Sequence, residues 1–321
     1  MKIAMIGIAA NPSTAMFSHN GGWTYTIIDQ LKSRFNAEVE IVKNPESIHE
    51  YDSICINEGL NYKEGSWNFF GGMQERSISM VNELTKYNGS VYCYNEKICW
   101  HSLFKRKELR DSSLKLDDMP IVNLLSTEEN HGSDIIIGDS HSVSIYEPGY
   151  NISRNDGKTL FGALKYNGIL KQFDFTGYNN VVLYFGNIDV RFHVDRNNGL
   201  EAIDKLVKDY SSFAGDLKEK GYNVTVQGLL PIESDDRKIP GTGLYKGKPF
   251  YGSKEDRQIY VDYFNQQMEY NSMYYDFVFR YWDLPLDGFD SPKFKCMESR
   301  QSVHLRPSYY LFKDKLFAHV G

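Results

Sequence analysis

Residues 134–149, DIIIGDSHSVSIYEPG, put a serine at a place where proteins often do chemistry. An apolar, strand-like run passes straight into a glycine, Asp139, Ser140 and His141, and the chain then turns polar. A serine hydroxyl becomes a useful nucleophile when an adjacent base removes its proton, and histidine does this near neutral pH. The structural alternative is a helix N-cap, for which Asp139 and Ser140 are both suited. The rest of the chain has to separate these two interpretations.

Three more pieces follow the serine in chain order. A glycine comes about twenty residues later, as Gly162 or Gly168, Gly186 follows the apolar run VVLYF, and His304 stands in SVHLRP. The order Gly-Asp-Ser, glycine, Gly-x-x-Asp and His-Leu resembles the SGNH (GDSL-type) hydrolase superfamily over residues 130–321. The resemblance implies a flavodoxin-like α/β fold and a serine-dependent ester hydrolase.

The resemblance also implies roles for individual residues. Ser140 is the nucleophile, His304 is the base that takes its proton, and Gly162 is a backbone donor to the oxyanion formed on attack. An oxyanion needs preorganised donors, such as the serine N–H, a glycine N–H and an asparagine side chain. These three residues are therefore the expected centre of the site.

The sequence departs from the family pattern at two positions. Gln301 stands where the family usually has an aspartate, three residues before the histidine. A neutral glutamine orients an imidazole but does not stabilise the imidazolium. The acid is therefore missing, or it comes from Glu298 or Asp290. In the third block the usual asparagine position holds Ile188, which cannot donate, so Asn187 is the nearest side-chain donor.

The segment NIDVRFHVDR carries a further group of polar side chains. If it continues the preceding strand, alternation places Asp189, Arg191, His193 and Asp195 on one face. One interpretation is an ion-paired strand end that supports the fold. The functional interpretation is a polar site beside Ser140 that binds a charged or sugar-like group.

The first part of the chain carries a second resemblance. Residues 51–97 contain a strand opened by Tyr-Asp, the string NFFGG at 68–72, a helix and a Tyr-rich strand. This pattern is similar to the N-terminal domain of bacteriophage DNA β-glucosyltransferases, which transfer glucose from a nucleotide sugar to a modified base. The resemblance implies that Glu96 is a general base. The alternative for NFFGG is a tight Gly-Gly turn anchored by two core phenylalanines.

Apolar strand-like runs alternate with amphipathic helices along the chain, which is typical of doubly wound parallel sheets. A length of 321 residues suits two domains. We expect an α/β fold with a Rossmann-like domain over 1–118 and an SGNH/flavodoxin-like domain over 128–321, with a loop insertion at 233–256. Residues 105–130 are interpreted as the connection. The strand-like runs are 2–9, 37–42, 52–59, 89–96, 134–140, 179–193 and 223–232, and the expected helices are 20–35, 73–87, 199–221 and 257–283.

Charge limits the choice of partners. A net charge of −6 and a pI of about 5.8 exclude a general electrostatic attraction to nucleic acid. FKRKELR at 104–110 is the dense basic run, and it is either a solvated helix face or a local patch. In the second case Lys105, Arg106, Lys107 and Arg110 would bind nucleic-acid phosphates.

Cysteine usage and hydropathy bear on the compartment. Cys55 and Cys93 lie in strand-like runs as small hydrophobes, and with Cys99 and Cys296 they show no metal-binding spacing. MKIAMIGIAANPS has too short an apolar run for a signal peptide, and no run approaches the roughly 20 apolar residues of a membrane span. We expect a cytoplasmic protein with no metal, no cofactor and no membrane partner.

Three hypotheses for function follow. The first is a Ser140–His304 esterase or acyl/glycosyl transferase, phage-encoded, acting on a modified nucleotide, nucleic acid or sugar. The second is a DNA-base glycosyltransferase that works through Glu96 and takes a nucleotide sugar. The third is a binding protein that keeps the fold but lacks the chemistry.

Overall fold

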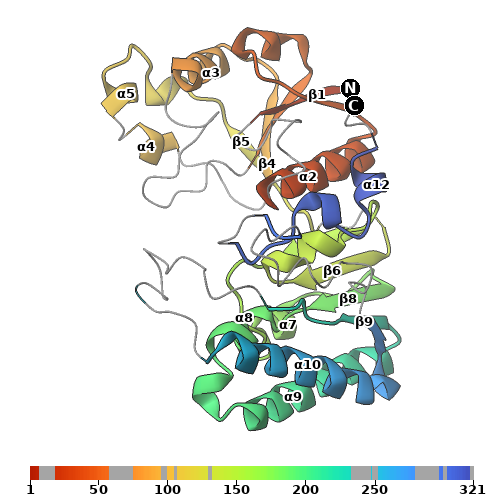
Figure 1. The fold of residues 1–321 in the computed structure, drawn as a ribbon. Coiled ribbons are helices and arrows are strands. Elements are labelled where there is room, and N and C mark those ends of the chain that lie inside the picture. The colour runs from red at the N-terminus through yellow and green to blue at the C-terminus, as the bar shows by residue number, and fades with distance from the viewer. Residues whose placement is uncertain are drawn as a thin grey trace. The chain divides into compact units, whose positions relative to one another are not determined.

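The structure is a computed structural model. It describes residues 1–6, 19–57, 75–94, 100–104, 107–128, 132–232, 247, 252–278, 296–298 and 302–318. Residue contacts divide the chain into two compact units (Figure 1). The first unit comprises Met1–His131 with Asp314–Gly321, and the second comprises Gly132–Lys313. The final residues therefore group with the first unit, whereas the sequence-based boundary placed them in the second domain.

The first unit contains a five-stranded parallel sheet in the order β2-β1-β3-β4-β5. The strands are β1 (Lys2–Ile6), β2 (Glu38–Ile41), β3 (Ser53–Ile56), β4 (Ser90–Tyr94) and β5 (Val122–Leu125). The helices are α2 (His19–Phe35), α3 (Glu75–Thr85), α4 (Trp100–Leu103) and α5 (Lys107–Arg110), with 3₁₀ turns η1 (Pro45–Glu50) and η2 (Leu116–Asp118). Fully buried aliphatic side chains of β3, including Ile54 and Ile56, pack with Met80, Val81 and Leu84 of α3.

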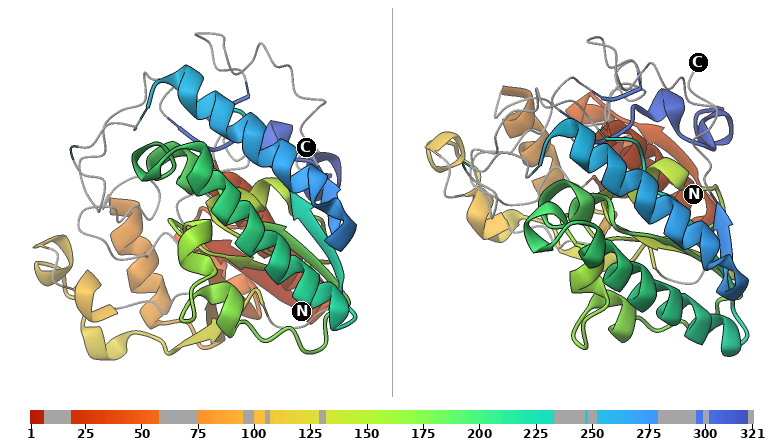
Figure 2. Two further views of the ribbon diagram at one scale, coloured as in Figure 1. Left: turned by 90° about the horizontal axis from the view of Figure 1, so that it is seen from below. Right: turned by 60° about the horizontal axis from the view of Figure 1, so that its bottom comes forward.

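The second unit contains another five-stranded parallel sheet, in the order β10-β9-β8-β6-β7. Its strands are β6 (Asp134–Gly138), β7 (Asn151–Arg154), β8 (Asn180–Tyr184), β9 (Asn223–Gln227) and β10 (Asp276–Val278). The helices are α6 (Leu160–Ala163), α7 (Ile169–Gln172), α8 (Asn187–Phe192), α9 (Leu200–Glu219) and α10 (Lys254–Tyr270). Its 3₁₀ turns are η3 (Ser140–Ile145), η4 (Asp195–Asn197), η5 (Ser272–Tyr274) and η6 (Pro307–Tyr309), and α12 (Lys313–Leu316) leads back to the first unit. Figures 1 and 2 show α9 and α10 side by side over one face of this sheet.

Both sheets confirm the expected α/β fold class, and both have the same strand order. Numbered within its own unit, each sheet reads 2-1-3-4-5, the order of flavodoxin-like doubly wound folds. In such sheets the chain leaves the first strand to one side and returns on the other. The switch point lies between β1 and β3 in the first unit and between β6 and β8 in the second. Ligands of open α/β sheets bind at the carboxyl ends of the strands at this point.

The structure corrects the expected elements in three places. Strands β5, β7 and β10 form where no strand was predicted. The helix expected over 257–283 ends at Tyr270, because η5 and β10 follow it. The strand expected to continue past Gly186 ends at Tyr184, and α8 replaces its second half.

The buried cysteines and the C-terminal packing complete the core of the first unit. Cys55 and Cys93 are buried in β3 and β4, as the sequence predicted, and burial raises the pKa of the Cys55 thiol. Leu316 and Phe317 are buried, and the Phe317 ring lies 4.8 Å from that of Tyr25 in α2. A segment from the far end of the sequence therefore contributes to this core.

Candidate active site

The site begins where two neighbouring strands of the second sheet end together. β6 and β8 pair in parallel, with Gly138 opposite Tyr184 as the last pair, and the Asp139 N–H extends the ladder by donating to the Tyr184 carbonyl at 3.1 Å. A Cβ atom on Gly138 would lie 2.5 Å from that carbonyl oxygen and 2.8 Å from Ser142 Cβ. Only glycine fits here, so the glycine before the serine is needed for the close approach of two backbones.

Asp139 is the N-cap of the 3₁₀ turn η3, which starts at Ser140. Its Oδ1 accepts the His141 backbone N–H at 2.8 Å, and its side chain is fully buried. The N-cap interpretation of this stretch is thus correct for Asp139. Because the aspartate does the capping, the Ser140 hydroxyl is left for another partner.

That partner is His304. Ser140 Oγ and His304 Nε2 lie 2.8 Å apart, although the two residues are 164 positions apart in the sequence. The pairing predicted from the order of the motifs is confirmed. Ser140 is 9% exposed, so the hydroxyl lies just below the surface. If Oγ donates this bond, Nε2 carries the lone pair, which is the arrangement that a base needs to accept the serine proton.

A short antiparallel bridge holds His304 in place. Met297 pairs with Leu305, and the Glu298 N–H donates to the His304 carbonyl at 2.9 Å. Met297 and Leu305 are buried, so the bridge is anchored in the core of the unit. The His304 N–H donates to Ser302 Oγ at 3.1 Å, which tightens the turn before it. The histidine is thus fixed from both sides along the chain.

Of the two candidate acids, Glu298 lies in the described part of the chain. Its carboxylate accepts the Ser302 hydroxyl at 2.9 Å, and Ser302 in turn binds the His304 backbone. Glu298 therefore supports the turn that carries the histidine. Asp290 and Gln301 lie outside the described residues, and the source of the acid stays a prediction.

No role for His141 follows from the sequence, although it stands next to Ser140. Its buried ring has Nδ1 at 2.8 Å from Asp139 Oδ1 and Nε2 at 3.1 Å from the carbonyl oxygen of Val303. The rings of His141 and His304 are 5.0 Å apart, centroid to centroid. The only signal in the sequence was the run Asp-Ser-His itself, because a bond to a backbone carbonyl leaves no trace in residue types.

The end of β8 supplies the second part of the site. Gly186 has a φ of +117°, a conformation that favours glycine, and it turns the chain from β8 into α8. The next residue, Asn187, is fully buried, and neither its Oδ1 nor its Nδ2 has a hydrogen-bond partner in the described residues. A buried amide without partners is rare and calls for an explanation. Ser140 and Asn187 leave adjacent strands at the same edge of the sheet, so Asn187 is a side-chain donor at this edge.

Gly162 does not have the free N–H that the resemblance implied. It lies in the short helix α6, and its N–H donates to the Thr159 hydroxyl at 3.0 Å as part of the N-cap of that helix. The Gly162 N–H is therefore engaged in its own turn. The family resemblance specified only a glycine and an approximate spacing, which do not reveal such a bond.

The polar group after Gly186 differs most from expectation. Asp189, Arg191 and His193 do not alternate on a strand, because residues 187–192 form α8. Arg191 is buried, and its Nη1 donates to the Asn187 carbonyl at 2.6 Å. Burial and the nearby Arg196 charge lower the pKa of His193, which follows the helix. The expected single face of four polar side chains is wrong.

Asp189 ties α8 to α6. Its two carboxyl oxygens accept the backbone N–H groups of Leu160 at 2.6 Å and Phe161 at 3.2 Å. Burial raises the pKa of Asp189 to about 7, the two N–H donors act in the opposite direction, and the charge of Asp139 adds to the rise. The contacts of Asp189 indicate that it supports the packing of α8 on α6. Its raised pKa means that burial disfavours the ionised carboxylate.

A cavity of about 710 Å³ opens beside α8. Its polar lining includes Asp189, His193, Arg196 and Lys205, and Phe161 and Leu206 contribute apolar surface. Both cationic and anionic groups line it, so it suits a polar ligand rather than a purely apolar chain.

The remaining predicted positions lie in the first unit. Glu96 and the NFFGG string at 68–72 fall outside the described residues, as do Lys105 and Arg106. Lys107 and Arg110 are exposed at the ends of α5, and Leu109 between them is fully buried. This matches a solvated helix face, and a role in nucleic-acid binding stays a prediction.

Two general properties hold for the described part of the chain. No helix there is both long enough and apolar enough to cross a lipid bilayer. Within the same residues, no group of three or more His, Cys, Asp or Glu side chains is arranged to hold a metal ion.

Comparison with known proteins adds little to this geometry. No protein-family model matches the sequence, and no curated protein matches it. Among solved structures, the chain is similar to the crystal structure of phospholipase A1 from Streptomyces albidoflavus NA297, with 16% identity and a TM-score of 0.27. That match covers 44% of this chain and 77% of the other. A likeness this low carries no conclusion about activity.

Proposed function

We propose that the second unit is a serine hydrolase or acyltransferase of the SGNH type, with Ser140 as nucleophile and His304 as general base. The observation that supports this is the 2.8 Å contact between Ser140 Oγ and His304 Nε2. It lies beside the switch point of a parallel sheet, where α/β proteins bind their ligands. Asp139 already satisfies the N-cap, so the hydroxyl has no structural task that requires it.

The proposed reaction proceeds in two halves. Ser140 Oγ attacks the carbonyl carbon of an ester while its proton passes to His304 Nε2. The tetrahedral intermediate collapses, the alkoxide leaves with the proton from Nε2, and an acyl group stays on the serine. Water, or a hydroxyl of an acceptor, then attacks the acyl carbon while His304 Nε2 takes its proton. The second tetrahedral intermediate collapses, the bond from the acyl carbon to Ser140 Oγ breaks, and Nε2 returns the proton to Oγ. Hydrolysis and acyl transfer differ only in this last nucleophile.

Stabilisation of the oxyanion is assigned to Asn187 and to the Ser140 N–H. Asn187 Nδ2 is a buried donor without a partner among the described residues, at the same sheet edge as the serine. Ser140 is the first residue of η3, and the first N–H groups of a helical turn have no intrahelical acceptor. Loss of one such donor typically lowers kcat by about 10²- to 10³-fold.

An ester on a polar molecule, such as an acylated sugar or nucleotide, is the proposed substrate class. The 710 Å³ cavity beside α8 offers His193, Arg196 and Lys205 for hydroxyl or phosphate groups. Asn187 begins α8, and Asp189 of the same helix lines this cavity. The apolar part of the lining leaves room for a short acyl chain.

The test is covalent labelling of the full-length protein with a fluorophosphonate, together with hydrolysis of p-nitrophenyl acetate. We expect one label per chain, located on Ser140 by mass spectrometry, and no label or turnover in Ser140→Ala. Ser212→Ala is the matched control, since Ser212 is exposed on α9 of the same unit. A wild-type protein that neither labels nor turns over, or a Ser140→Ala variant that remains active, contradicts the proposal.

A further inference from the structure

The neighbouring residues Ser140 and His141 contact the neighbouring residues His304 and Val303 in the candidate site. Ser140 Oγ binds the ring of His304, and the next residue, His141, binds the carbonyl of the preceding residue, Val303. Residues 140 and 141 thus contact the base in two ways. Ser140 binds the His304 ring, and His141 binds the peptide group that precedes His304. Because a peptide bond is planar, holding its carbonyl restricts the direction of the following residue.

Counting donors and acceptors fixes the protons of this arrangement. A backbone carbonyl only accepts, so His141 Nε2 must carry a proton. On the other side, Asp139 Oδ1 lies 2.8 Å from Nδ1 and also accepts the His141 backbone N–H. If both Nδ1 and Oδ1 lacked a proton, two lone pairs would face each other in a buried site. The Asp139–His141 pair therefore holds one proton between Nδ1 and Oδ1 in addition to the one on Nε2.

The surroundings bury this pair. Asp139 and His141 are both buried, and Asp139 Oδ2 has no hydrogen-bond partner in the described residues. The aromatic rings that face His141 are those of Tyr184 in β8, at 6.2 Å, and His304. The charge of Asp139 also acts on Asp189 of α8 and on Tyr210 of α9, raising the pKa of each.

We propose that His141 is a positioning residue for the base: its Nε2–H holds the Val303 carbonyl and so keeps His304 aimed at Ser140. This inference rests on the proposed function. His141 makes no hydrogen bond to the serine hydroxyl or to the His304 ring in the described residues, and it holds His304 through the backbone that precedes it. The residue that follows the nucleophile thus also holds the segment that carries the base.

Two substitutions test the donor. His141→Gln keeps an N–H group that can donate to the Val303 carbonyl. His141→Phe keeps the ring volume and removes the donor. The control is His101→Phe in α4 of the first unit, where His101 is exposed. Each variant is assayed as the full chain for kcat and KM, with the melting temperature measured alongside.

We expect His141→Phe to lower kcat by about 10- to 100-fold with little change in KM, as a misplaced catalytic group does. His141→Gln should recover most of this loss, because its amide N–H restores the donor to the Val303 carbonyl. A purely structural role would lower the melting temperature in both variants, and kcat per folded molecule would be unchanged. His101→Phe should match the wild type throughout.

Failure of the inference differs from failure of the proposed function. If turnover depends on Ser140 but His141→Phe equals the wild type, the inference is wrong and the function stands. The inference is also wrong if His141→Gln is as slow as His141→Phe. If His141→Phe does not fold, His141→Gln is compared with His141→Ala, which lacks the donor, and an equal kcat in the two variants overturns the inference. A protein whose turnover does not depend on Ser140 overturns both.

Discussion

Replacing Asp189 by asparagine removes a buried charge from the helix α8 and leaves the shape of the side chain unchanged. Burial raises the pKa of this carboxyl from 3.8 to about 7 in the folded protein. The unfolded chain ionises at its ordinary value, so it binds fewer protons than the folded chain between pH 4 and 7. Stability therefore falls as pH rises through this window and levels off above it. The rise in pKa corresponds to about 4 kcal/mol at pH 8, as an upper limit.

Asparagine has its own cost, which does not depend on pH. The two carboxyl oxygens accept one N–H each, from Leu160 and Phe161, and asparagine offers only one oxygen. One buried N–H loses its acceptor, at roughly 1–3 kcal/mol. We expect Asp189→Asn to be less stable than the wild type at pH 4.5 and equal or more stable at pH 8.

Urea denaturation from pH 4.5 to 8.5 measures this difference. The stability of the variant minus that of the wild type should rise by up to about 1.4 kcal/mol per pH unit and become constant above pH 7. Asp174→Asn is the matched control. The Asp174 carboxylate also accepts a backbone N–H, from Thr176 at 2.9 Å, but its pKa is lowered, so its difference should be flat over this range. A flat difference for Asp189→Asn would show that the buried carboxyl is ionised at its ordinary pKa, against the reasoning.

Three further changes test the site. Gly138→Ala should destabilise the second unit by roughly 1–3 kcal/mol in urea titrations, because the added Cβ overlaps the Tyr184 carbonyl. Gly132→Ala should not, because the nearest atom to its Cβ lies at 3.4 Å. Equal stability of the two variants contradicts the close approach. Asn187→Ala should lower kcat by about 10²- to 10³-fold without lowering the melting temperature, since its amide has no hydrogen bond to lose in the described structure; unchanged kcat would remove it from the oxyanion site. Gln301→Asp should raise kcat for p-nitrophenyl acetate, because a carboxylate stabilises the imidazolium, and lower or equal turnover would mean that the base is already served.

The sequence predicted the strands at the centres of both sheets but missed strands at their edges. β5, β7 and β10 all occupy an edge position in the described sheets. An edge strand has a neighbour on one side only and carries polar residues, as in NISR of β7, so it lacks the continuous apolar run of a buried strand. The prediction rested on continuous apolar runs, and edge strands such as β7 lack them.

The candidate site divides along a similar line. The pairing of Ser140 with His304 followed from residue types in a fixed order, and the structure confirms it. Residues 189–195 look like an alternating strand, but the chain turns at Gly186 and residues 187–192 form α8. The contact of His141 with Val303 involves a backbone carbonyl, which any residue type could supply. Geometry set by the backbone was therefore out of reach of residue patterns.

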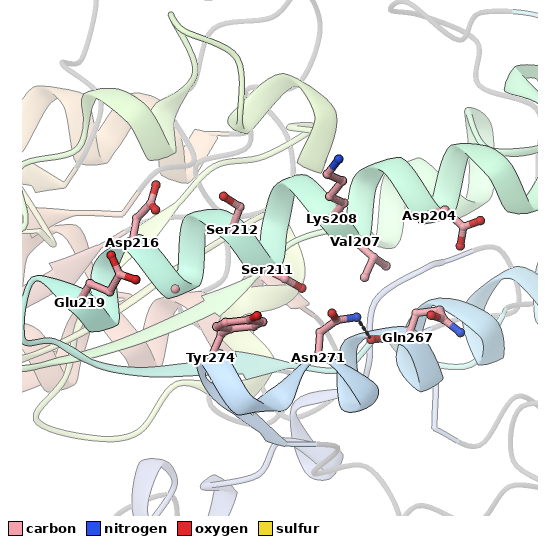
Figure 3. A pocket seen from close by; sticks show the side chains of 11 residues that line it. Asp204, Val207, Lys208, Ser211, Ser212, Asp216, Glu219, Gln267, Asn271 and Tyr274 are labelled. Carbon is pink, nitrogen blue, oxygen red and sulfur yellow. Dashed lines mark hydrogen bonds between the residues drawn. The ribbon is translucent and has the colours of Figure 1, made fainter.

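A hollow of about 410 Å³ between α9 and α10 lies apart from these residues. Figure 3 shows the carboxylates of Asp216 and Glu219 near one end and that of Asp204 at the other, with Tyr274 and Asn271 facing α9. The Asn271 side chain donates to the Gln267 carbonyl at 2.7 Å, which closes the end of α10. None of the lining residues belongs to the candidate site, so the exposed ones, such as Ser212, are suited as surface controls.

The packing of Phe317 against Tyr25 has a consequence for the order in which the protein folds. During synthesis the sheet of the first unit emerges before the second unit, but the part of its core around Phe317 emerges only after the second unit. The second unit is continuous in sequence and can fold by itself while the first waits with its core open. Folding of the second unit shortens the flexible chain between the first sheet and residues 314–321. This reduces the entropy that is lost when those residues pack into the core of the first unit. Chaperone demand should therefore fall on the first unit, whose apolar surface stays uncovered longest.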